Sequence, residues 1–309
     1  MSDTYLVTGA MGCIGAWTLY HLAKQGKRAI SFDLTDNRQR LDLLMRRDEQ
    51  EQITFLQGDL TAFEQVRAAI NDHGVTHIIH LAALQVPMCR ANPVLGAQVN
   101  VTGTVNIFEA AKQAGIKHLA GASSVAVYGT PDDYPPTLLA HDALMLPRTL
   151  YGVYKVAGEG IGRIYWQDYG ISSNVLRPFT VYGVGRDQGL TSDPTKAMLA
   201  AAKGENFHIG FGGKMQFHYA SDVGLQFIEA AEKSLDGAFG FNLGTPVVSV
   251  AEVAQIIMQS RPDVTITYGE NTLPFPEGCD STLYHERLNT LTETPLAQGI
   301  QATIEHFSA

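Results

Sequence analysis

The feature that most restricts this sequence is a glycine-spaced segment near its start. Residues 8–15, TGAMGCIG, follow a short apolar run at 5–8 and open an amphipathic stretch at 14–25. Glycines at this spacing allow a tight turn after a strand and close packing of the next helix against that strand. We therefore predict a strand–turn–helix unit in which the first N–H groups of the helix are free to bind an anion.

The rest of the first half repeats this alternation of short and long elements. Apolar runs of strand length lie at 28–32, 53–57, 77–81, 118–123 and 173–177, and amphipathic stretches of helix length lie at 63–71, 97–114 and 151–169. Strands that are apolar throughout are typical of a sheet covered on both faces. Their alternation with helices predicts an α/β protein with a Rossmann-type, doubly wound parallel sheet.

After Pro178 the pattern changes, because Gly, Pro and Thr interrupt the stretch at 180–194. Shorter elements follow: helices at 195–202 and 250–259, and strands at 207–209, 239–243 and 264–268. A helix at 221–232 is expected to pack back on the first part. We predict a sheet domain of residues 1–177 with a return segment at about 215–245, interleaved with a smaller lobe of residues 178–309.

The end of the second strand carries a residue that selects the ligand of the glycine segment. Asp33 closes the run AISFD, and a carboxylate there binds a ribose 2′-hydroxyl and repels a 2′-phosphate. Together with the glycine segment it predicts binding of NAD in preference to NADP. Arg38 and Arg40 could weaken this preference, although a solvated helix face is the role we expect for them.

Tyr151 and Lys155 stand four residues apart and share one helix face. A free phenol, with a pKa of about 10, is a poor base at neutral pH. A nearby ammonium group stabilises the phenolate, so the pair can exchange a proton with a substrate hydroxyl. The same spacing recurs at Tyr20 and Lys24, on the helix behind the glycine segment, and we interpret that second match as structural.

Ser124 ends the fifth predicted strand. Ligands of doubly wound sheets bind outside the carboxyl ends of the strands, so its hydroxyl would lie beside the oxygen that Tyr151 protonates or deprotonates. The alternative role is to cap a turn. We predict Ser124, Tyr151 and Lys155 as the catalytic set.

Composition narrows the partners and the compartment. A net charge of −9 argues against nucleic acid or an anionic membrane as a partner. No apolar run approaches the ~20 residues of a membrane span, and residues 1–3 leave no room for a signal peptide. Three cysteines without CxxC spacing indicate a reduced, cytoplasmic protein. The ten histidines form no HExxH motif, so we predict no metal site.

In order and spacing these residues resemble the extended short-chain dehydrogenase/reductase family, the NAD-dependent epimerase/dehydratase group. The resemblance runs from Tyr5 to about Val223. Its motifs are TGxxGxxG at 8–15, Asp33, GDL at 58–60, HLAA at 80–83, NVTGT at 100–104, SS at 123–124, VYG at 127–129, Tyr151 with Lys155, RP at 177–178, VYG at 181–183 and DV at 222–223.

The resemblance implies roles for particular residues. Asp59 and Leu60 would border the adenine, Lys155 would also bind the nicotinamide ribose, and Asn100 would support the catalytic site. The full cofactor-binding set is Gly9, Met11, Gly12, Cys13, Ile14, Gly15, Asp33, Asp59, Leu60, Leu81, Ala82, Ala83, Asn100, Tyr151, Lys155 and Pro178. Related enzymes dimerise through the helices at 97–114 and 151–170, which implies a homodimer.

Departures from the family pattern bear on the substrate. The position of an arginine found in nucleotide-sugar members holds Met215, and 273–278 lacks their Arg-x-Gly-Asp/Glu stretch. Arginine forks normally hold diphosphates, so the usual diphosphate anchor is missing, although Arg186, Lys203 or Lys214 could replace it. We expect Gln85, Ser124, Tyr128 and Arg186 to bind the substrate. Arg90 or Arg186 could hold the carboxylate of a sugar acid.

These observations favour an NAD-dependent oxidoreductase that transfers hydride between NAD and a small polyol, sugar or sugar acid. A redox-neutral sugar or nucleotide-sugar epimerase with retained NAD is the first alternative. A non-catalytic, NAD-binding redox sensor is the second, and the intact set Ser124, Tyr151 and Lys155 weighs against it.

Overall fold

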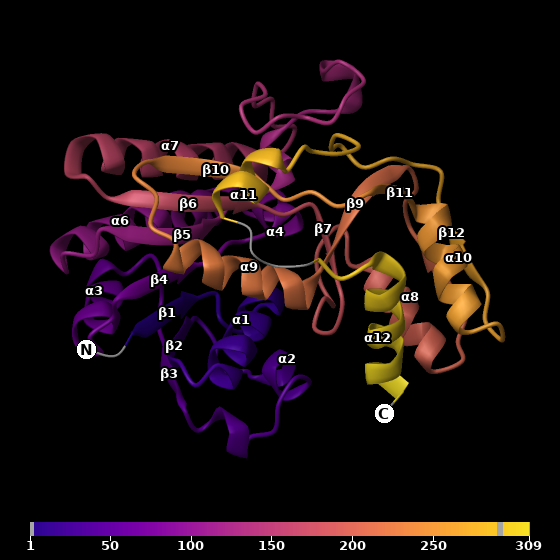
Figure 1. Ribbon diagram of the computed structural model, residues 1–309, viewed down its shortest axis with the longest axis horizontal. Coiled ribbons are helices and arrows are strands. Elements are labelled where there is room, and N and C mark those ends of the chain that lie inside the picture. Colours follow the sequence, from indigo (N-terminus) through magenta and orange to yellow (C-terminus); the bar gives the residue numbers. More distant parts are fainter. Residues whose placement is uncertain (1–2, 289–292, 309) are drawn as a thin grey trace.

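A seven-stranded parallel sheet forms the centre of the computed structural model, which describes residues 3–288 and 293–308 (Figure 1). The strand order is β10-β6-β5-β4-β1-β2-β3. The strands are β1 (Thr4–Thr8), β2 (Arg28–Asp33), β3 (Ile53–Gln57), β4 (His77–His80), β5 (His118–Ala122), β6 (Ser172–Arg177) and β10 (Ala238–Asn242). The order changes direction between β1 and β4, and a crevice opens at such a switch point beyond the carboxyl ends of the strands.

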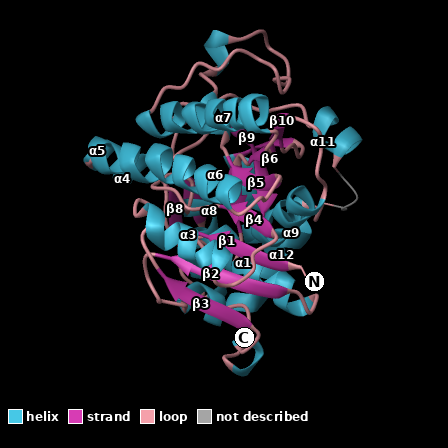
Figure 2. Cartoon of the chain, turned by 90° about the vertical axis from the view of Figure 1, so that its left-hand side faces the viewer, coloured by secondary structure: helices cyan, strands magenta, loops and turns pink. Residues whose placement is uncertain are grey.

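Helices cover both faces of this sheet (Figure 2). One face carries α3 (Phe63–Asn71), α6 (Gly103–Gln113) and α7 (Leu150–Tyr169), and the other carries α1 (Cys13–Lys24) and α9 (Ala220–Glu232). Helices α1 and α9 pack against each other and share one apolar core with β1 and β6. The predicted doubly wound α/β fold is confirmed, and the helix expected at 221–232 packs on the sheet as predicted.

Apart from α9 and β10, most of the segments after β6 build a second group of elements beside the sheet, which we call the C-terminal lobe (Figure 1). Its helices are α8 (Asp193–Ala202), α10 (Val250–Ser260) and α12 (Leu296–Ser308). Its strands form two small sheets, β7 (Thr180–Tyr182), β9 (Lys214–Tyr219) and β11 (Val247–Ser249) in one, and β8 (Phe207–Ile209) and β12 (Ile266–Tyr268) in the other. Residues of α8, α10 and α12 share a core of their own.

Several elements differ from the sequence prediction. In place of one helix at 97–114, short helices α4 (Val86–Ala91) and α5 (Pro93–Ala97) lead through a π-helical turn, Gln98–Thr102, into α6. Helices α2 (Gln39–Asp42), α11 (Thr282–Arg287) and α12 were not predicted. Strand β9 was also missed, because Gln216 and His218 are buried in it and obscure its apolar pattern.

Candidate active site

The glycine segment lies where β1 passes into α1. Gly9 has a φ of +65°, and a Cβ on it would come within 2.7 Å of the backbone of Ala82, at the end of β4. Helix α1 begins after Gly12 without a side-chain cap, so its first N–H groups are left for a ligand. This backbone suits the close approach of a pyrophosphate.

A cleft of about 520 Å³ extends from this segment along the carboxyl edge of the sheet. Its walls include most of the cofactor-binding residues expected from the sequence, namely Gly9, Met11, Gly12, Cys13, Ile14, Gly15, Asp33, Asp59, Leu60, Leu81, Ala82 and Ala83. The Asp33 carboxylate accepts the N–H of Met11 at 2.9 Å and so stays at the end of β2, within the cleft. The donors and the carboxylate fit a dinucleotide.

Arg40 has a different place from the solvated helix face that we expected. Its Nη1 donates to the carbonyl of Met11 at 2.9 Å, and its Nη2 pairs with Asp187 at 2.7 Å. Both side chains line the cleft. Asp187 pairs with this guanidinium, and the Asp33 carboxylate remains on the wall of the cleft.

A smaller cavity of about 160 Å³ adjoins the cleft and shares Ile14, Leu81 and Gln85 with it. Ser124, Tyr151 and Lys155 all line this cavity, and so does Pro178. The segments that carry the three predicted catalytic residues, which lie far apart in the sequence, therefore meet in one pocket.

Gly152 allows this meeting of segments. Thr149 caps α7 by accepting the N–H of Gly152 at 3.0 Å. A Cβ at position 152 would lie 2.1 Å from the carbonyl oxygen of Ala126. Only glycine lets the first turn of α7 pack so closely on the segment after Ser124, and this contact brings Tyr151 to the serine.

Burial controls the charge of the pair on α7. It raises the pKa of Tyr151, while a hydrogen bond with Ser124 and the charge of Arg186 act in the opposite direction. Burial also lowers the pKa of Lys155 to about 8. The Lys155 ammonium donates to the carbonyl of Ala122 at 2.6 Å and lies 5.5 Å from the centre of the Tyr151 ring. Tyr151 is therefore held as the neutral phenol, and the Lys155 ammonium is the nearby charge that would stabilise its phenolate during proton transfer.

Ser124 combines the two roles that the sequence left open. Its Oγ accepts the N–H of Ala126 at 3.2 Å and so caps the short turn that follows β5. The same hydroxyl lies close enough to Tyr151 to lower the pKa of its phenol. Turn capping fixes the serine, and its position beside the phenol leaves it available to a substrate oxygen.

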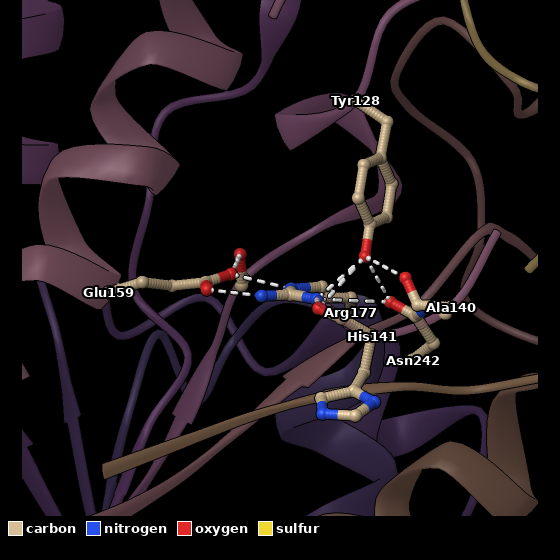
Figure 3. A network of polar contacts seen from close by, with 7 residues as sticks. Tyr128, Ala140, His141, Glu159, Arg177 and Asn242 are labelled. Atoms are coloured by element: carbon tan, nitrogen blue, oxygen red, sulfur yellow. Dashed lines mark hydrogen bonds and ion pairs between the residues drawn. The ribbon is translucent and has the colours of Figure 1, made fainter. Parts of the chain in front are cut away.

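Two sequence-based assignments need correction. Tyr128 does not face the pocket, because it is fully buried and its hydroxyl bonds to Arg177 and Asn242 (Figure 3). Asn100 is also buried and does not line the cleft. Its side-chain amide instead accepts the backbone N–H of Leu84 at 2.7 Å and donates to the carbonyl of Leu84 at 2.9 Å. Asn100 therefore holds the backbone of Leu84, which lines the cleft.

Arg186 lines the pocket beside Tyr151, whereas Arg90 is exposed on α4 and does not. Nη2 of Arg186 donates to the hydroxyl of Thr191 at 3.2 Å. The buried Nε of Arg186 has no hydrogen-bond partner in the part of the chain that the structure describes. No Asp or Glu is among the described residues that line this pocket. The Arg186 side chain lines both this pocket and the dinucleotide cleft, and it forms no ion pair with a carboxylate of the described residues. Gln85 lines the same wall.

Apolar residues occupy the two places, position 215 and the loop at 273–278, that lack the arginines expected to bind a diphosphate. Phe275 lines the pocket and stacks edge-on against Phe179, with ring centres 6.4 Å apart. Met215 is buried, and its sulfur accepts a hydrogen bond from Thr180 at 3.1 Å. Phe275 could not be predicted as a pocket residue from the sequence, because its loop has no regular period.

A dinucleotide cleft that opens onto a tyrosine–lysine pair defines an NAD-dependent enzyme of the short-chain dehydrogenase/reductase type. Residues 5–244 match the model of the NAD dependent epimerase/dehydratase family. The chain belongs to this family, and NAD is its cofactor.

Relatives within the family differ in activity. A UDP-glucose 4-epimerase of Mycolicibacterium smegmatis is 29% identical over 98% of this chain and 97% of its own length. The structure of MoeE5 with UDP-glucuronic acid and NAD is 26% identical, with a TM-score of 0.82 over 99% of this chain and 98% of that one. The fold is also shared with L-threonine dehydrogenase of Clostridium difficile, at 24% identity and a TM-score of 0.86 over 99% and 98% of the two chains.

Other features concern metals and membranes. Within residues 3–288 and 293–308, no group of His, Cys, Asp and Glu side chains is arranged to hold a metal ion. Within the same ranges, no helix has the length and apolar character of a membrane span. All three cysteines are buried free thiols.

Proposed function

We propose that this enzyme carries out net oxidation or reduction of a small hydroxylated carboxylate, such as a sugar acid, with NAD. The observation that supports this most is the Arg186 guanidinium, which faces a 160 Å³ pocket beside Tyr151 without an acidic partner. The side chain is half-buried and its Nε is fully buried, and removing part of a cation from water is costly unless it is paired. A substrate carboxylate would supply the missing partner.

The residues then divide the work as follows. Bound NAD supplies the nicotinamide carbon that takes or gives hydride. Tyr151 takes the proton of the substrate alcohol as the carbonyl forms, and Ser124 donates a hydrogen bond to the same oxygen. Lys155 stabilises the phenolate. Arg186 holds the carboxylate, so the substrate is fixed at two points and presents one face to the nicotinamide.

The test is a panel of hydroxy acids and sugar acids, each assayed with NAD beside the matching uncharged polyol, with NADH absorbance as the readout. Hydrogen bonds to charged groups contribute about 1.5–3 kcal/mol, so Arg186→Gln should lower kcat/KM for an acid about 10- to 100-fold. Arg90→Gln is the matched control, because Arg90 lies outside the pocket. Equal turnover of acids and uncharged polyols, unaffected by Arg186→Gln, would refute the proposal.

Epimerisation with retained NAD is the second candidate, and the UDP-glucose 4-epimerase relative favours it. It predicts that NAD copurifies with the protein, that a sugar is interconverted and that no NADH accumulates. Net dehydrogenation predicts turnover that requires added NAD and forms NADH in proportion to product.

We further propose a cytoplasmic homodimer. Val153 and Ile164 share one face of α7 and are 46% and 49% exposed, which suits an apolar contact with a second copy. Three buried free thiols fit a reducing compartment. In this proposal residues 1–177, with the return through α9 and β10, bind NAD, and the C-terminal lobe binds the substrate.

A further inference from the structure

Behind the catalytic pocket, Glu159 lies one turn beyond Lys155 on α7 and forms a buried ion pair with Arg177 of β6 (Figure 3). The two side chains are 11% and 3% exposed. Oε1 of Glu159 accepts from Nε of Arg177 at 2.8 Å and from the hydroxyl of Ser123 at 2.6 Å. Oε2 accepts from Nη2 of Arg177 at 2.6 Å. The carboxylate thus joins α7, β5 and β6.

The other side of the guanidinium holds two further segments. Nη1 of Arg177 donates to the hydroxyl of Tyr128 at 2.7 Å, to the carbonyl of His141 at 2.6 Å and to Oδ1 of Asn242 at 3.2 Å. A Cβ at Gly240 on the edge strand β10 would lie 2.4 Å from Nη2 of Arg177. The backbone of β10 therefore lies directly against the ion pair.

Three members of this network stand beside residues of the catalytic pocket. Ser123 precedes Ser124, and Arg177 precedes Pro178, which lines the pocket. Glu159 and Lys155 lie on one face of α7. A buried ion pair is weak evidence for stability, since apolar residues of similar volume often serve as well. Its location suggests a role in the site itself.

We propose that Glu159, held by Arg177, is a positioning residue that keeps the Lys155 ammonium charged and in place and fixes Ser124 through Ser123. This inference rests on the proposed roles of Tyr151 and Lys155. It adds two residues that touch neither the cofactor cleft nor the substrate oxygen.

The charges around Lys155 are consistent with this role. Burial lowers the pKa of Lys155, while negative charge on the Cys89 sulfur of α4, present only once that thiol ionises, and on Glu159 raises it. Burial raises the pKa of the Cys89 thiol and also that of Tyr151, so both are neutral at pH 7. Burial lowers the pKa of His80 on β4 to about 3, so that ring is neutral too. Glu159 is therefore the group among these that supplies a full negative charge.

The experiment measures the charge state of Lys155 directly. The protein is labelled with ¹³C-lysine, saturated with NAD and titrated by NMR, and the Lys155 signal is assigned by its loss in Lys155→Met. Glu159→Gln leaves the Arg177 cation uncompensated, so the pKa of Lys155 should fall by about one. Arg177→Gln leaves the Glu159 carboxylate uncompensated, so the pKa should rise.

A merely structural role would not produce opposite changes in the two variants. The double variant Glu159→Gln/Arg177→Gln should return the pKa of Lys155 close to that of the wild type. Glu109→Gln, which removes an ion pair on α6, is the matched control and should leave it unchanged. If Arg177→Gln does not fold, Glu159→Gln decides alone. An unchanged pKa of Lys155 in Glu159→Gln overturns the proposal.

A second readout uses whichever substrate the panel identifies. Glu159→Gln should lower kcat most at alkaline pH, moving the alkaline limit of the pH profile down, with KM within about twofold because Glu159 does not touch the substrate. A uniform loss of kcat at all pH values would contradict the charge role. Failure of the substrate panel leaves the NMR titration intact, so the two proposals fail separately.

Discussion

Replacing Tyr151 by Phe removes one hydroxyl from the catalytic pocket and keeps the ring. Among the described residues that line the pocket, the other titratable groups are Lys155 and Arg186, and a guanidinium does not give up its proton. General acid–base catalysis contributes about 10²–10⁴-fold, which corresponds to about 3–5 kcal/mol of the barrier. We expect kcat to fall by that factor and the Kd for NAD to stay within about threefold.

The structure also predicts how the residual activity depends on pH. Burial lowers the pKa of Lys155 to about 8, so a growing fraction of neutral amine is present as the pH rises through that value. Without the phenol, this amine is the remaining base in the pocket. The residual rate of Tyr151→Phe should therefore increase with pH through about 8.

Tyr20→Phe is the matched control. The Lys24 ammonium lies 5.6 Å from the Tyr20 ring centre, almost the same as the 5.5 Å between Lys155 and Tyr151. Lys24 is paired with Glu49 at 2.6 Å, and neither Tyr20 nor Lys24 is among the residues that line the catalytic pocket or the dinucleotide cleft. Steady-state rates of both variants should be measured from pH 6 to 10. A Tyr151→Phe enzyme within threefold of wild type would show that another group transfers the proton.

Three further predictions test the cofactor, the core and the assembly. Asp33→Ala should narrow the preference for NAD over NADP in binding titrations, and equal affinity of the wild type for both would contradict the role of this carboxylate. Burial lowers the pKa of His80 to about 3 and that of His218 to about 4, below the unfolded value. The free energy of unfolding should therefore be highest above pH 6.5 and fall on acidification, by about 4 kcal/mol at pH 5 for the two groups together. Urea unfolding that gives equal free energies of unfolding at pH 7 and pH 5 would contradict this. Ile164→Glu should convert the proposed dimer to monomer in light scattering, and a wild-type monomer at micromolar concentration would refute the assembly.

Local patterns were enough to predict the sheet, the glycine segment and Asp33. Each of these features depends on residues close together in the sequence, or on a rule about where strands end. Ser124 and Tyr151 were placed together because parallel strands and the helices that connect them leave a known edge open. The agreement therefore comes from topology as much as from composition.

Contacts between distant polar residues could not be predicted in this way. Tyr128 follows β5 closely in the sequence. Its hydroxyl nevertheless points away from the pocket, because it forms hydrogen bonds with Arg177 and Asn242. Arg40 pairs with Asp187, far along the chain, and this pairing brings it from an expected surface position to the cleft. Hydrogen-bond partners of buried polar groups depend on the assembled fold, and a single sequence carries no period that identifies them.

The shape and charge of the pocket bear on the choice between net redox chemistry and epimerisation. An epimerase must let the keto intermediate turn over and then return hydride to its other face. In this pocket Arg186 would hold a carboxylate at one end, while Phe275 presents an apolar wall and offers no second anchor. Turning the intermediate over within about 160 Å³ would break the charge-assisted bond to Arg186 in every cycle. Orientation contributes several kcal/mol to such a reaction, so an enzyme that loses it mid-cycle would be slow. Net hydride transfer needs one orientation only, and Arg186 and the Ser124–Tyr151 pair would fix that orientation by holding the substrate at two points.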